Sequence, residues 1–380
     1  MINEEVILLD EFKQSKKELW FDSLVVEKNI GWVFANDFNG LFEIDLQTYN
    51  SRYLGSLPQY SITQASLCFC MEKVKDDILI LPWESREIYI FNLNSKEFTK
   101  AEMPYPGYRF CGATVSGEKV YMICNNSPKI VVFDMYNNNF YCLDEIEEHK
   151  FKRNRIPDRV PFRKGICSVG EYIYCVSCDD SEVYRIKAAD DAIEYYELSC
   201  ADNGLRNIAF DGEYFWISEW DKASIIRWKP ESNQFQKYEC PEYTGIVYRS
   251  ADIVCMDRKV YMFPTGGDDR DDVICFNKES REWEVPSQFK EYGSKAKMNK
   301  SCWNHIYTVA QKYGDDIFAF SGKTNELIRY NKCSEIREGV LFVHLNKAEL
   351  SELVNGLVNN RILFESECEI DDYLKLITLG

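Results

Sequence analysis

The sequence predicts an all-β fold in which one four-stranded unit is repeated along the chain. The clearest copy spans 259–286, where apolar residues alternate before and after Gly266-Gly267, and a polar turn at 277–280 precedes Trp283. Alternating apolar residues mark strands with one buried face, and glycine supplies the positive φ that tight turns require. The same pattern of strands and turns recurs along most of the chain, which indicates a repeat protein.

The spacing of the repeat predicts how many units there are. The residues that close the expected third strand of each unit recur at a mean spacing of about 48 residues, which suits a propeller blade. They are Asp45, Asn92, Asp134, Lys187, Lys229, Asn277 and Asn331. A lone sheet of this kind cannot bury its faces, whereas radial stacking gives every sheet two neighbours. We therefore expect a closed, seven-bladed β-propeller of four-stranded antiparallel blades.

Each unit is expected to contain a first strand, a second strand often introduced by Gly or Asp, a third strand ending near Asp or Asn, and a fourth strand. The second strands are expected at 31–34, 78–81, 117–121, 170–174, 211–216, 259–263 and 316–320. The third strands are expected at 41–45, 88–92, 130–134, 183–186, 225–228, 273–276 and 327–331. The blades then fall at about 19–57, 65–104, 108–146, 161–198, 205–240, 248–286 and 302–344.

The two ends of the repeat are less regular. Either residues 335–344 supply the outer strand of the seventh blade, or residues 6–9 supply it from the N-terminal side, and we favour the former. Beyond His344 the pattern changes, because the apolar residues of 350–358 recur at helical spacing. We expect a C-terminal helical extension at 346–380 that either packs on the propeller as a lid or docks a protein partner.

Composition narrows the class of protein. The 62 acidic and 45 basic residues give a net charge of −17, which argues against nucleic acid or an anionic membrane as a partner. The 15 cysteines lack the spacing of a disulfide framework, and most fall inside apolar strand runs, where a free thiol packs as a small hydrophobe. The first residues lack a basic signal-peptide region, and no window approaches a membrane span of about 18 apolar residues. The sequence thus predicts a cytoplasmic protein.

The segment 259–286 resembles a kelch-type blade, with an apolar strand ending in Gly-Gly, a second apolar strand, a polar turn and a Trp. The resemblance to kelch-like propellers covers roughly 19–345, although the Gly pair is missing from the other units. The signatures of WD-type blades and of sialidase Asp-boxes are absent. Some kelch-type and other propellers are epimerases or lyases that hold a substrate carboxylate with arginine. A copper oxidase of the galactose oxidase kind is disfavoured, because the chain has 3 histidines and no export signal.

Four consecutive blades carry an arginine where the chain enters the first strand. First strands line the channel of a propeller, and their entry loops open on the ligand-binding face. These arginines precede an aromatic residue of the second strand by 12, 11, 10 and 12 residues, so we expect their guanidinium groups around one funnel: Arg109, Arg163, Arg206 and Arg249. A guanidinium is a permanently charged, planar fork of donors that suits carboxylate or phosphate. The entry loops at 149–163 and 290–300 add further basic residues.

An alternative reading gives these arginines a structural role. The loops between second and third strands lie on the same face and carry acidic residues, among them Glu84, Asp179-Asp180, Glu219 and 268–272. The arginines would then form salt bridges between neighbouring blades. The sequence leaves both alternatives open, because a change of one residue in spacing reverses the facing of a strand side chain.

Other candidates lie near the same face. Trp83, Trp220 and Trp303 are positioned to stack on a sugar or an aromatic group, although tryptophan more often packs in a core or rim. His305 stands at the entry of the seventh blade, and it and Glu219 are candidate general bases. We expect no metal site. The histidines have no ligand spacing, and neither Cys175–Cys178 nor the acidic run 268–272 has the accompanying ligands of a zinc or calcium site.

No Gly-rich phosphate loop, nucleophile elbow or kinase signature is found. We therefore expect a non-catalytic recognition or scaffold propeller that needs no cofactor. Its partner would be an anionic small molecule, an acidic glycan, or an acidic peptide or protein, bound at the arginine-lined face. The alternative is a propeller lyase or epimerase acting on a sugar acid or related carboxylate, with the arginines as the carboxylate clamp. A third hypothesis is an assembly subunit that uses 346–380.

Overall fold

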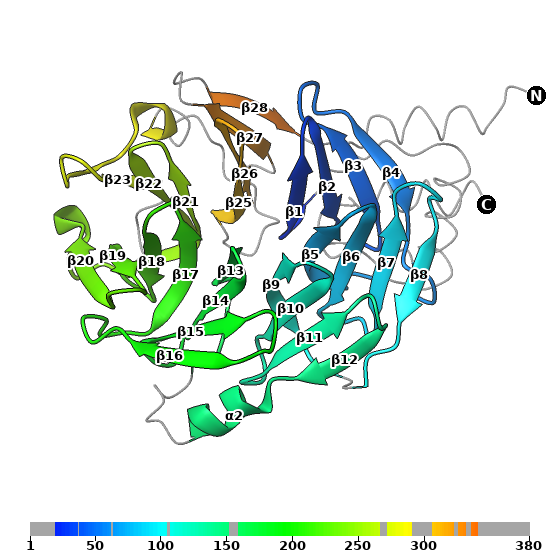
Figure 1. Cartoon of the computed structure of the whole chain (residues 1–380). Helices are drawn as coiled ribbons and strands as arrows, with labels where there is room; N and C mark the ends of the chain where they lie inside the picture. Colours follow the sequence, from blue (N-terminus) through cyan, green and yellow to red (C-terminus); the bar gives the residue numbers. More distant parts are fainter. Residues whose placement is uncertain are drawn as a thin grey trace, which may run out of the picture.

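The computed structural model describes residues 20–36, 38–61, 64–104, 107–151, 159–266, 272–290, 306–322, 326–331 and 336–340. Its strands form seven four-stranded sheets arranged in a ring around a central axis (Figure 1). Each sheet consists of four strands that are consecutive in the chain. Neighbouring strands run antiparallel. The prediction of an all-β, seven-bladed propeller is confirmed.

The strands are numbered along the chain, four to a blade. The innermost strands are β1 (Leu24–Glu27), β5 (Cys68–Val74), β9 (Phe110–Ser116), β13 (Ile166–Val169), β17 (Leu205–Phe210), β21 (Arg249–Met256) and β25 (Tyr307–Tyr313). The second strands are β2 (Ile30–Phe34), β6 (Asp77–Pro82), β10 (Lys119–Cys124), β14 (Tyr172–Val176), β18 (Phe215–Glu219), β22 (Lys259–Gly266) and β26 (Asp316–Ser321).

The outer half of each blade follows the same order. The third strands are β3 (Leu41–Asp45), β7 (Ile88–Asn92), β11 (Ile130–Asp134), β15 (Glu182–Lys187), β19 (Ser224–Lys229), β23 (Ile274–Asn277) and β27 (Glu326–Asn331). The outermost strands are β4 (Ser51–Gly55), β8 (Phe98–Ala101), β12 (Asn139–Cys142), β16 (Ile193–Glu197), β20 (Gln234–Glu239), β24 (Trp283–Glu284) and β28 (Ile336–Val340). One helix, α2 (Asp144–Phe151), follows β12, and a short 3-10 turn, η1 (Pro241–Tyr243), follows β20.

The residues that close the third strands cap the turns that follow. The Oδ1 atom of Asp45 accepts hydrogen bonds from the backbone N–H groups of Gln47 and Thr48 (2.8 and 3.2 Å). Asn92 and Asn277 cap their own turns in the same way. Four residues beyond the closing residue the chain takes a positive φ, at Tyr49, Lys96, Asn138, Asp191, Asn233 and Arg281. Such a turn reverses the chain into an antiparallel neighbour, which explains why Asp and Asn recur in the repeat.

The ring closes without an exchange of strands between the two ends of the repeat. β28 pairs with β27, so the seventh blade takes its outer strand from the C-terminal side, as we favoured. Side chains of the first and seventh blades then pack together where β1 lies beside β25 (Figure 1). The rings of Phe21 and Phe320 are 4.1 Å apart, and the Thr308 hydroxyl donates to the Phe21 carbonyl oxygen (2.6 Å).

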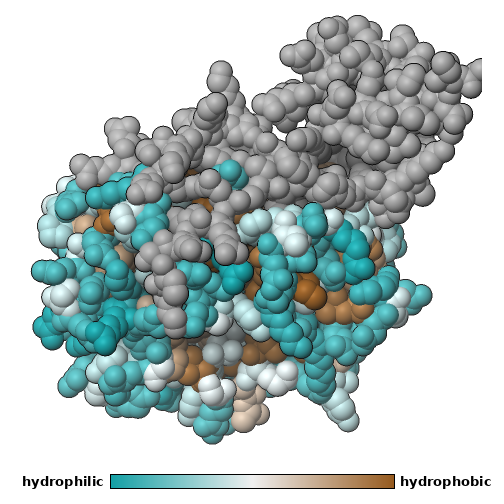
Figure 2. All heavy atoms as spheres, turned by 90° about the horizontal axis from the view of Figure 1, so that it is seen from above, coloured by the Kyte–Doolittle hydropathy of each residue, from teal (hydrophilic) through white to brown (hydrophobic). Residues whose placement is uncertain are grey.

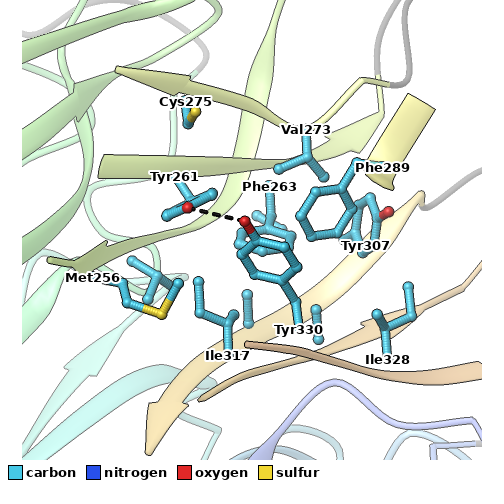
Figure 3. Packing of buried hydrophobic residues seen from close by; sticks show 14 of the residues in the cluster. Met256, Tyr261, Phe263, Val273, Cys275, Phe289, Tyr307, Ile317, Ile328 and Tyr330 are labelled. Carbon is cyan, nitrogen blue, oxygen red and sulfur yellow. Dashed lines mark hydrogen bonds between the residues drawn. The ribbon is translucent and has the colours of Figure 1, made fainter. Parts of the chain in front are cut away.

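The core is divided into clusters that lie mostly between neighbouring blades. Figure 3 shows the cluster between the sixth and seventh blades, where the Tyr261 and Tyr330 hydroxyls are 3.3 Å apart. Phe263 meets Phe289 and Tyr307 edge to face, at ring separations of 5.7 and 5.4 Å. Aromatic side chains bury large areas, so each interface contributes a substantial share of the hydrophobic stabilisation.

The outer surface is largely hydrophilic on the side seen in Figure 2, with apolar residues visible mainly in recesses. Among the described residues, the exposed large hydrophobic side chains are spread singly over different elements: Ile30, Tyr136, Phe151 and Tyr313. Within the same residues, no helix has both the length and the apolar character needed to cross a membrane. The expected helical extension at 346–380 lies outside the described residues, as do residues 6–9.

Removing an aromatic ring at the closing interface should destabilise the whole ring. Phe21 has no exposed surface and packs on Phe320. We expect Phe21→Ala to lower the free energy of unfolding by about 3–5 kcal/mol. The measurement is urea unfolding followed by fluorescence. Tyr136→Ala, at a residue that is 79% exposed, is the control and should change stability by less than about 0.5 kcal/mol. Equal effects of the two variants would contradict this account of closure.

Glu72 on β5 should make stability depend on pH. Burial raises the pKa of its carboxyl from 4.5 to about 8. Between these values the folded chain binds a proton that the unfolded chain has released, so the free energy of unfolding falls as pH rises. Glu72→Gln should remove this part of the dependence and be more stable than the parent above about pH 8. Unfolding in urea across this pH range tests it, and an unchanged slope would refute it. The exposed Glu102→Gln is the control.

Candidate functional site

The predicted entry arginines lie at the starts of the innermost strands. Arg206 and Arg249 belong to β17 and β21, whereas Arg109 and Arg163 come just before β9 and β13. Two of them pair with a carboxylate of the preceding blade. Arg109 Nη2 is 2.6 Å from Glu84 Oε1, and Arg249 Nε is 2.5 Å from Asp221 Oδ1. Both arginines are substantially exposed, so these are inter-blade salt bridges of the kind the alternative reading anticipated.

The other two entry arginines have no such partner. Arg206 is 6% exposed, and its Nε donates a hydrogen bond to the Ser250 carbonyl oxygen (2.5 Å). The Nε atom of Arg163 is buried without a hydrogen-bond partner. Neither guanidinium has a carboxylate within ion-pairing distance among the residues that the structure describes. The four arginines are therefore not equivalent.

The local sequence explains the difference. The salt-bridge carboxylates stand two residues beyond the second strand of their blade, as Glu84 after β6 and Asp221 after β18. In the third and fourth blades the corresponding residues are Asn126 and Cys178, which carry no charge at neutral pH. Burial raises the pKa of the Cys178 thiol to about 12, although Arg206 and Arg163 oppose the shift. Arg163 and Arg206 thus follow the two blades that lack the acid.

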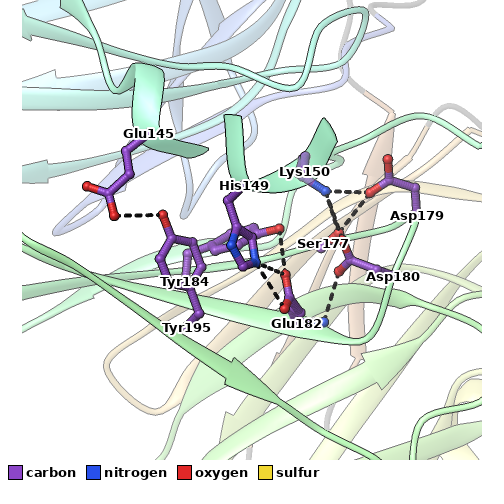
Figure 4. A network of polar contacts seen from close by, with 9 residues as sticks. All are labelled: Glu145, His149, Lys150, Ser177, Asp179, Asp180, Glu182, Tyr184 and Tyr195. Carbon is purple, nitrogen blue, oxygen red and sulfur yellow. Dashed lines mark hydrogen bonds and ion pairs between the residues drawn. The ribbon is translucent and has the colours of Figure 1, made fainter. Parts of the chain in front are cut away.

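The fourth blade does carry two acidic residues in this loop, but a buried lysine neutralises them. Lys150 reaches in from α2, and its Nζ lies 2.5 Å from Asp179 Oδ1 and 3.3 Å from Asp180 Oδ2 (Figure 4). It also donates to the Ser177 hydroxyl at 2.7 Å. The Lys150 side chain has no exposed surface, and such a charge is tolerated only when it is paired and hydrogen-bonded.

The rest of the polar network in Figure 4 fixes α2 against the fourth blade. The ring of His149 stacks on Tyr195 of β16 at 3.9 Å, and its Nε2 is 2.9 Å from Glu182 Oε2. The Tyr195 hydroxyl donates to Glu145 Oε1 (3.1 Å). These contacts hold the helix in the position from which Lys150 reaches the loop.

Arg159 lies with Arg206 beside Trp220. The guanidinium carbons of Arg159 and Arg206 lie 5.3 and 4.5 Å from the centre of the indole ring. Arg159 also binds Asn203 through Nη2 (3.1 Å) and approaches Asp221 Oδ2 at 3.8 Å. We call Arg159, Arg163, Arg206 and Arg249 the arginine cluster. Asp221 is the carboxylate that pairs with it among the described residues.

The charges of the arginine cluster act on one another. Burial, and next the charge of Arg163, lower the pKa of Arg206 from 12.5 to about 10, and Arg249 adds to the effect. Burial likewise lowers the pKa of Arg159, with Arg249 contributing and Asp221 opposing. Arg206 nevertheless stays protonated at neutral pH. The cluster is consequently a local concentration of positive charge on an acidic protein.

Close approach of neighbouring blades brings the cluster together. A Cβ atom at Gly165 would lie 2.6 Å from the Arg206 carbonyl oxygen and 2.3 Å from a methyl group of Val176. A Cβ atom at Gly112 would lie 3.2 Å from the Arg163 carbonyl oxygen. Only glycine at 165 allows the fourth and fifth blades to meet this closely, because real side chains do not approach to such distances.

Lys164 crosses the channel beside the cluster. Its Nζ donates to the carbonyl oxygens of Asp22 and Thr308 (2.9 and 2.5 Å) and lies 3.8 Å from Asp252 Oδ2. A fourth-blade side chain therefore contacts the first, sixth and seventh blades. Burial raises the pKa of Asp22 to about 6, although Lys164 and Arg163 lower it. Sequence reasoning missed Lys164, and the only signal was a lysine directly after an entry arginine.

The remaining predicted site residues do not all lie at the arginine cluster. Arg109 forms a separate group with Glu84 and Trp83, whose ring lies 5.6 Å from the Arg109 guanidinium and stacks on Phe69 at 4.8 Å. Trp220 contacts two guanidinium groups of the arginine cluster, so it forms part of the wall of the site. Trp303 and His305 lie outside the described residues, so their expected roles stay predictions.

The carboxylate of Glu219 is engaged within the fifth blade. Glu219 has no exposed surface. Lys237 Nζ lies 2.9 Å from its Oε2, the Asp202 N–H donates to its Oε1 (3.1 Å), and the Ser224 hydroxyl donates to Oε2. A buried carboxylate held by three donors has no access to a ligand in this conformation. The buried position of Glu219 indicates a role in the stability of the fifth blade and does not support a role as a general base.

Metal-binding groups were also sought. Within the described residues, no three His, Cys, Asp or Glu side chains converge as a metal site would require. Cys175 and Cys178 are both buried free thiols. Burial raises the pKa of both, so neither is a thiolate at neutral pH.

Comparison with known proteins bears on the fold alone. No family model matches the sequence. No curated protein matches it either. Among solved structures, the chain is similar to virginiamycin B lyase from Staphylococcus aureus, with a TM-score of 0.59 and 11% identity over 81% of this chain and 96% of that chain.

Two further solved structures have other roles. YCF48 bound to a D1 peptide gives a TM-score of 0.58 and 13% identity over 83% of this chain and 94% of that chain. A chain of the mitotic checkpoint complex gives a TM-score of 0.56 and 8% identity over 86% of this chain and 90% of that chain. These likenesses support a seven-bladed propeller. They correspond to lyase-like and YCF48-like propellers and do not single out the kelch type.

Removing the buried lysine should destabilise the protein. Lys150→Met leaves Asp179 and Asp180 without their cation, and we expect a loss of about 3–5 kcal/mol in the free energy of unfolding. The triple variant Lys150→Met, Asp179→Asn, Asp180→Asn should recover part of this loss, since no uncompensated charge remains. Arg109→Ala, which breaks an exposed pair, should cost less than about 1 kcal/mol. Urea unfolding checks all three, and a near-neutral Lys150→Met would disprove the assignment.

Proposed function

We propose that this propeller is a recognition protein that binds an anionic ligand at the arginine cluster. The observation that carries the proposal is the state of Arg163 and Arg206. Within the part of the chain that the structure describes, neither has a carboxylate at ion-pairing distance, although the equivalent Arg109 and Arg249 each have one. A partly desolvated cation without a partner is costly to the folded state. A protein that retains two such groups side by side gains most when an external anion supplies the missing charge.

The local charge favours the same conclusion. The whole chain has a net charge of −17, which repels anions at long range. At the arginine cluster, however, Asp221 is the described carboxylate within ion-pairing distance of the guanidinium groups, while Asp22 and Asp252 interact with Arg163 and Arg206 over longer distances. Lys164 adds a further positive charge beside the Arg163 backbone. A site with one predominant sign of charge attracts ligands of the opposite sign and raises their local concentration.

The classes of ligand that we propose are an anionic small molecule, an acidic glycan, and an acidic peptide or protein. Propellers similar in fold to this chain include one solved with a bound peptide and one solved in a multiprotein complex. This similarity supports recognition as a use of the fold, and the residues of this chain supply the case for an anion.

The alternative function is that of a lyase or epimerase acting on a sugar acid. The similarity in fold to virginiamycin B lyase is the reason for considering it. Such chemistry needs a general base near the carboxylate clamp. Of the two candidates, Glu219 is buried and held by three donors, and His305 lies outside the described residues. Recognition without catalysis is therefore the function that the described residues favour.

We also propose a reducing compartment, the cytoplasm, for this protein. The support is that cysteines such as Cys68, Cys111 and Cys178 are buried free thiols. Burial raises the pKa of several of them, which makes them slow to oxidise. Compartments of this kind keep thiols reduced.

The test is a thermal-shift screen of the full chain with sugar acids, nucleotides, acidic peptides and phosphorylated peptides. A ligand that binds the native state must raise its melting temperature. We expect an anion to do so and Arg163→Gln to abolish the shift, while leaving the unliganded protein at least as stable because a charge without a partner is removed.

Arg109→Gln is the matched control, because Arg109 is an entry arginine that already pairs with Glu84. This variant should keep the ligand-induced shift. The proposal fails if no anion raises the melting temperature, or if Arg163→Gln and Arg109→Gln respond alike.

A further inference from the structure

We infer that Arg163 and Arg206 form a subsite for a phosphate monoester in its dianionic form. This inference rests on the proposed anion site and names the chemistry of its ligand. It concerns the two inner members of the arginine cluster rather than the cluster as a whole.

The first argument is a balance of charge. Asp221 lies against Arg249 (2.5 Å) and Arg159 (3.8 Å), Asp22 interacts electrostatically with Arg163 and Lys164, and Asp252 does so with Arg206 and Lys164. The four arginines and Lys164 thus face three described carboxylates, which leaves a surplus of two positive charges, and Arg163 is close enough to lower the pKa of Arg206. A carboxylate would neutralise one of them, whereas a phosphate monoester above its second pKa of about 6 carries nearly two negative charges and neutralises both.

The second argument concerns donors. The Nε of Arg206 donates a hydrogen bond to the Ser250 carbonyl oxygen. The terminal nitrogens of Arg206 have no hydrogen-bond partner among the described residues. Arg163 has a buried Nε without a partner. A carboxylate has two oxygens in one plane and matches a single guanidinium fork. The three terminal oxygens of a phosphate monoester accept hydrogen bonds from two forks at once, which is why arginine pairs recur at phosphate sites.

The third argument is that two independent features prevent carboxylates of the loops after the second strands from pairing with Arg163 and Arg206, as Glu84 and Asp221 pair with arginines elsewhere. In the third and fourth blades, Asn126 and Cys178 replace the acid that pairs with arginine elsewhere. The acidic residues that remain nearby, Asp179 and Asp180, are bound to Lys150 of α2 (Figure 4). A structure that needed the arginines only for salt bridges would have no use for either feature.

The phosphate monoester has two possible sources, a small phosphorylated metabolite and a phosphorylated side chain of a protein. Both present the same dianion to Arg163 and Arg206. Titration calorimetry of the full chain distinguishes them by using glucose 6-phosphate and a phosphoserine peptide as separate probes. The matched carboxylate probes are glucuronate and the same peptide with aspartate in place of phosphoserine.

We expect at least one phosphate probe to bind at least about tenfold more tightly than its carboxylate counterpart at about pH 7.5. Its affinity should also fall at about pH 5, where the phosphate is a monoanion. The fall should be smaller than about tenfold, because Asp22, whose pKa is about 6, loses its negative charge near Arg163 over the same range. The probe that binds more tightly identifies the source.

Asn126→Asp is the variant that tests the pairing most directly. It places an acid at the exposed position that corresponds to Glu84, where it should pair with Arg163 as Glu84 pairs with Arg109. We expect Asn126→Asp and Arg163→Gln each to weaken phosphate binding at least about tenfold. Glu84→Gln, the control at the equivalent position of the second blade, should leave it unchanged.

The outcomes separate this inference from the proposed function. Carboxylate probes that bind as tightly as phosphate probes, and depend on Arg163, would overturn the phosphate assignment and leave the anion site standing. Binding of no probe, or binding that neither Asn126→Asp nor Arg163→Gln weakens, would overturn both.

Discussion

Closure of the ring between the first and seventh blades is the constraint on which the rest of the structure depends. No strand crosses this junction, because each sheet is built from four consecutive strands. Side-chain packing between Phe21 and Phe320 and the Thr308 hydrogen bond hold it instead. Lys164 reinforces it from across the channel by binding both Asp22 and Thr308. Without closure, the entry strands of the fourth, fifth and sixth blades would not be held around one mouth.

The candidate site lies where the salt bridge found between other neighbouring blades is missing from the described residues. In two blades an entry arginine pairs with an acid of the preceding blade, as Arg109 does with Glu84. Such exposed pairs contribute little to stability, so their loss is tolerated. The third and fourth blades have Asn126 and Cys178 where the acid stands in other blades, and each is followed by an entry arginine. In a repeat protein, a change at one partner of such a pair leaves a cation aligned by the scaffold, with no further functional group needed.

Helix α2 contributes to this site from a distance. It follows the third blade and packs against the fourth (Figure 4). His149 contacts Tyr195 and Glu182, and Glu145 accepts a hydrogen bond from Tyr195. Its buried Lys150 neutralises two carboxylates that lie near the arginine cluster. Burying three ionised groups costs desolvation energy that packing alone would not require.

The sequence by itself determined the blade count, the order of strands and the positions of the entry arginines. These follow from short-range chemistry, namely apolar alternation and the Asp or Asn side chains that cap each turn. Only the tertiary structure decided which arginines are paired. It separated Arg109 from the cluster, buried Glu219 against Lys237, and brought Lys150 and Lys164 to the acids and carbonyl groups of other elements. The physical reason is that an ion pair depends on a few ångströms between residues far apart in the chain, and no periodicity records that distance.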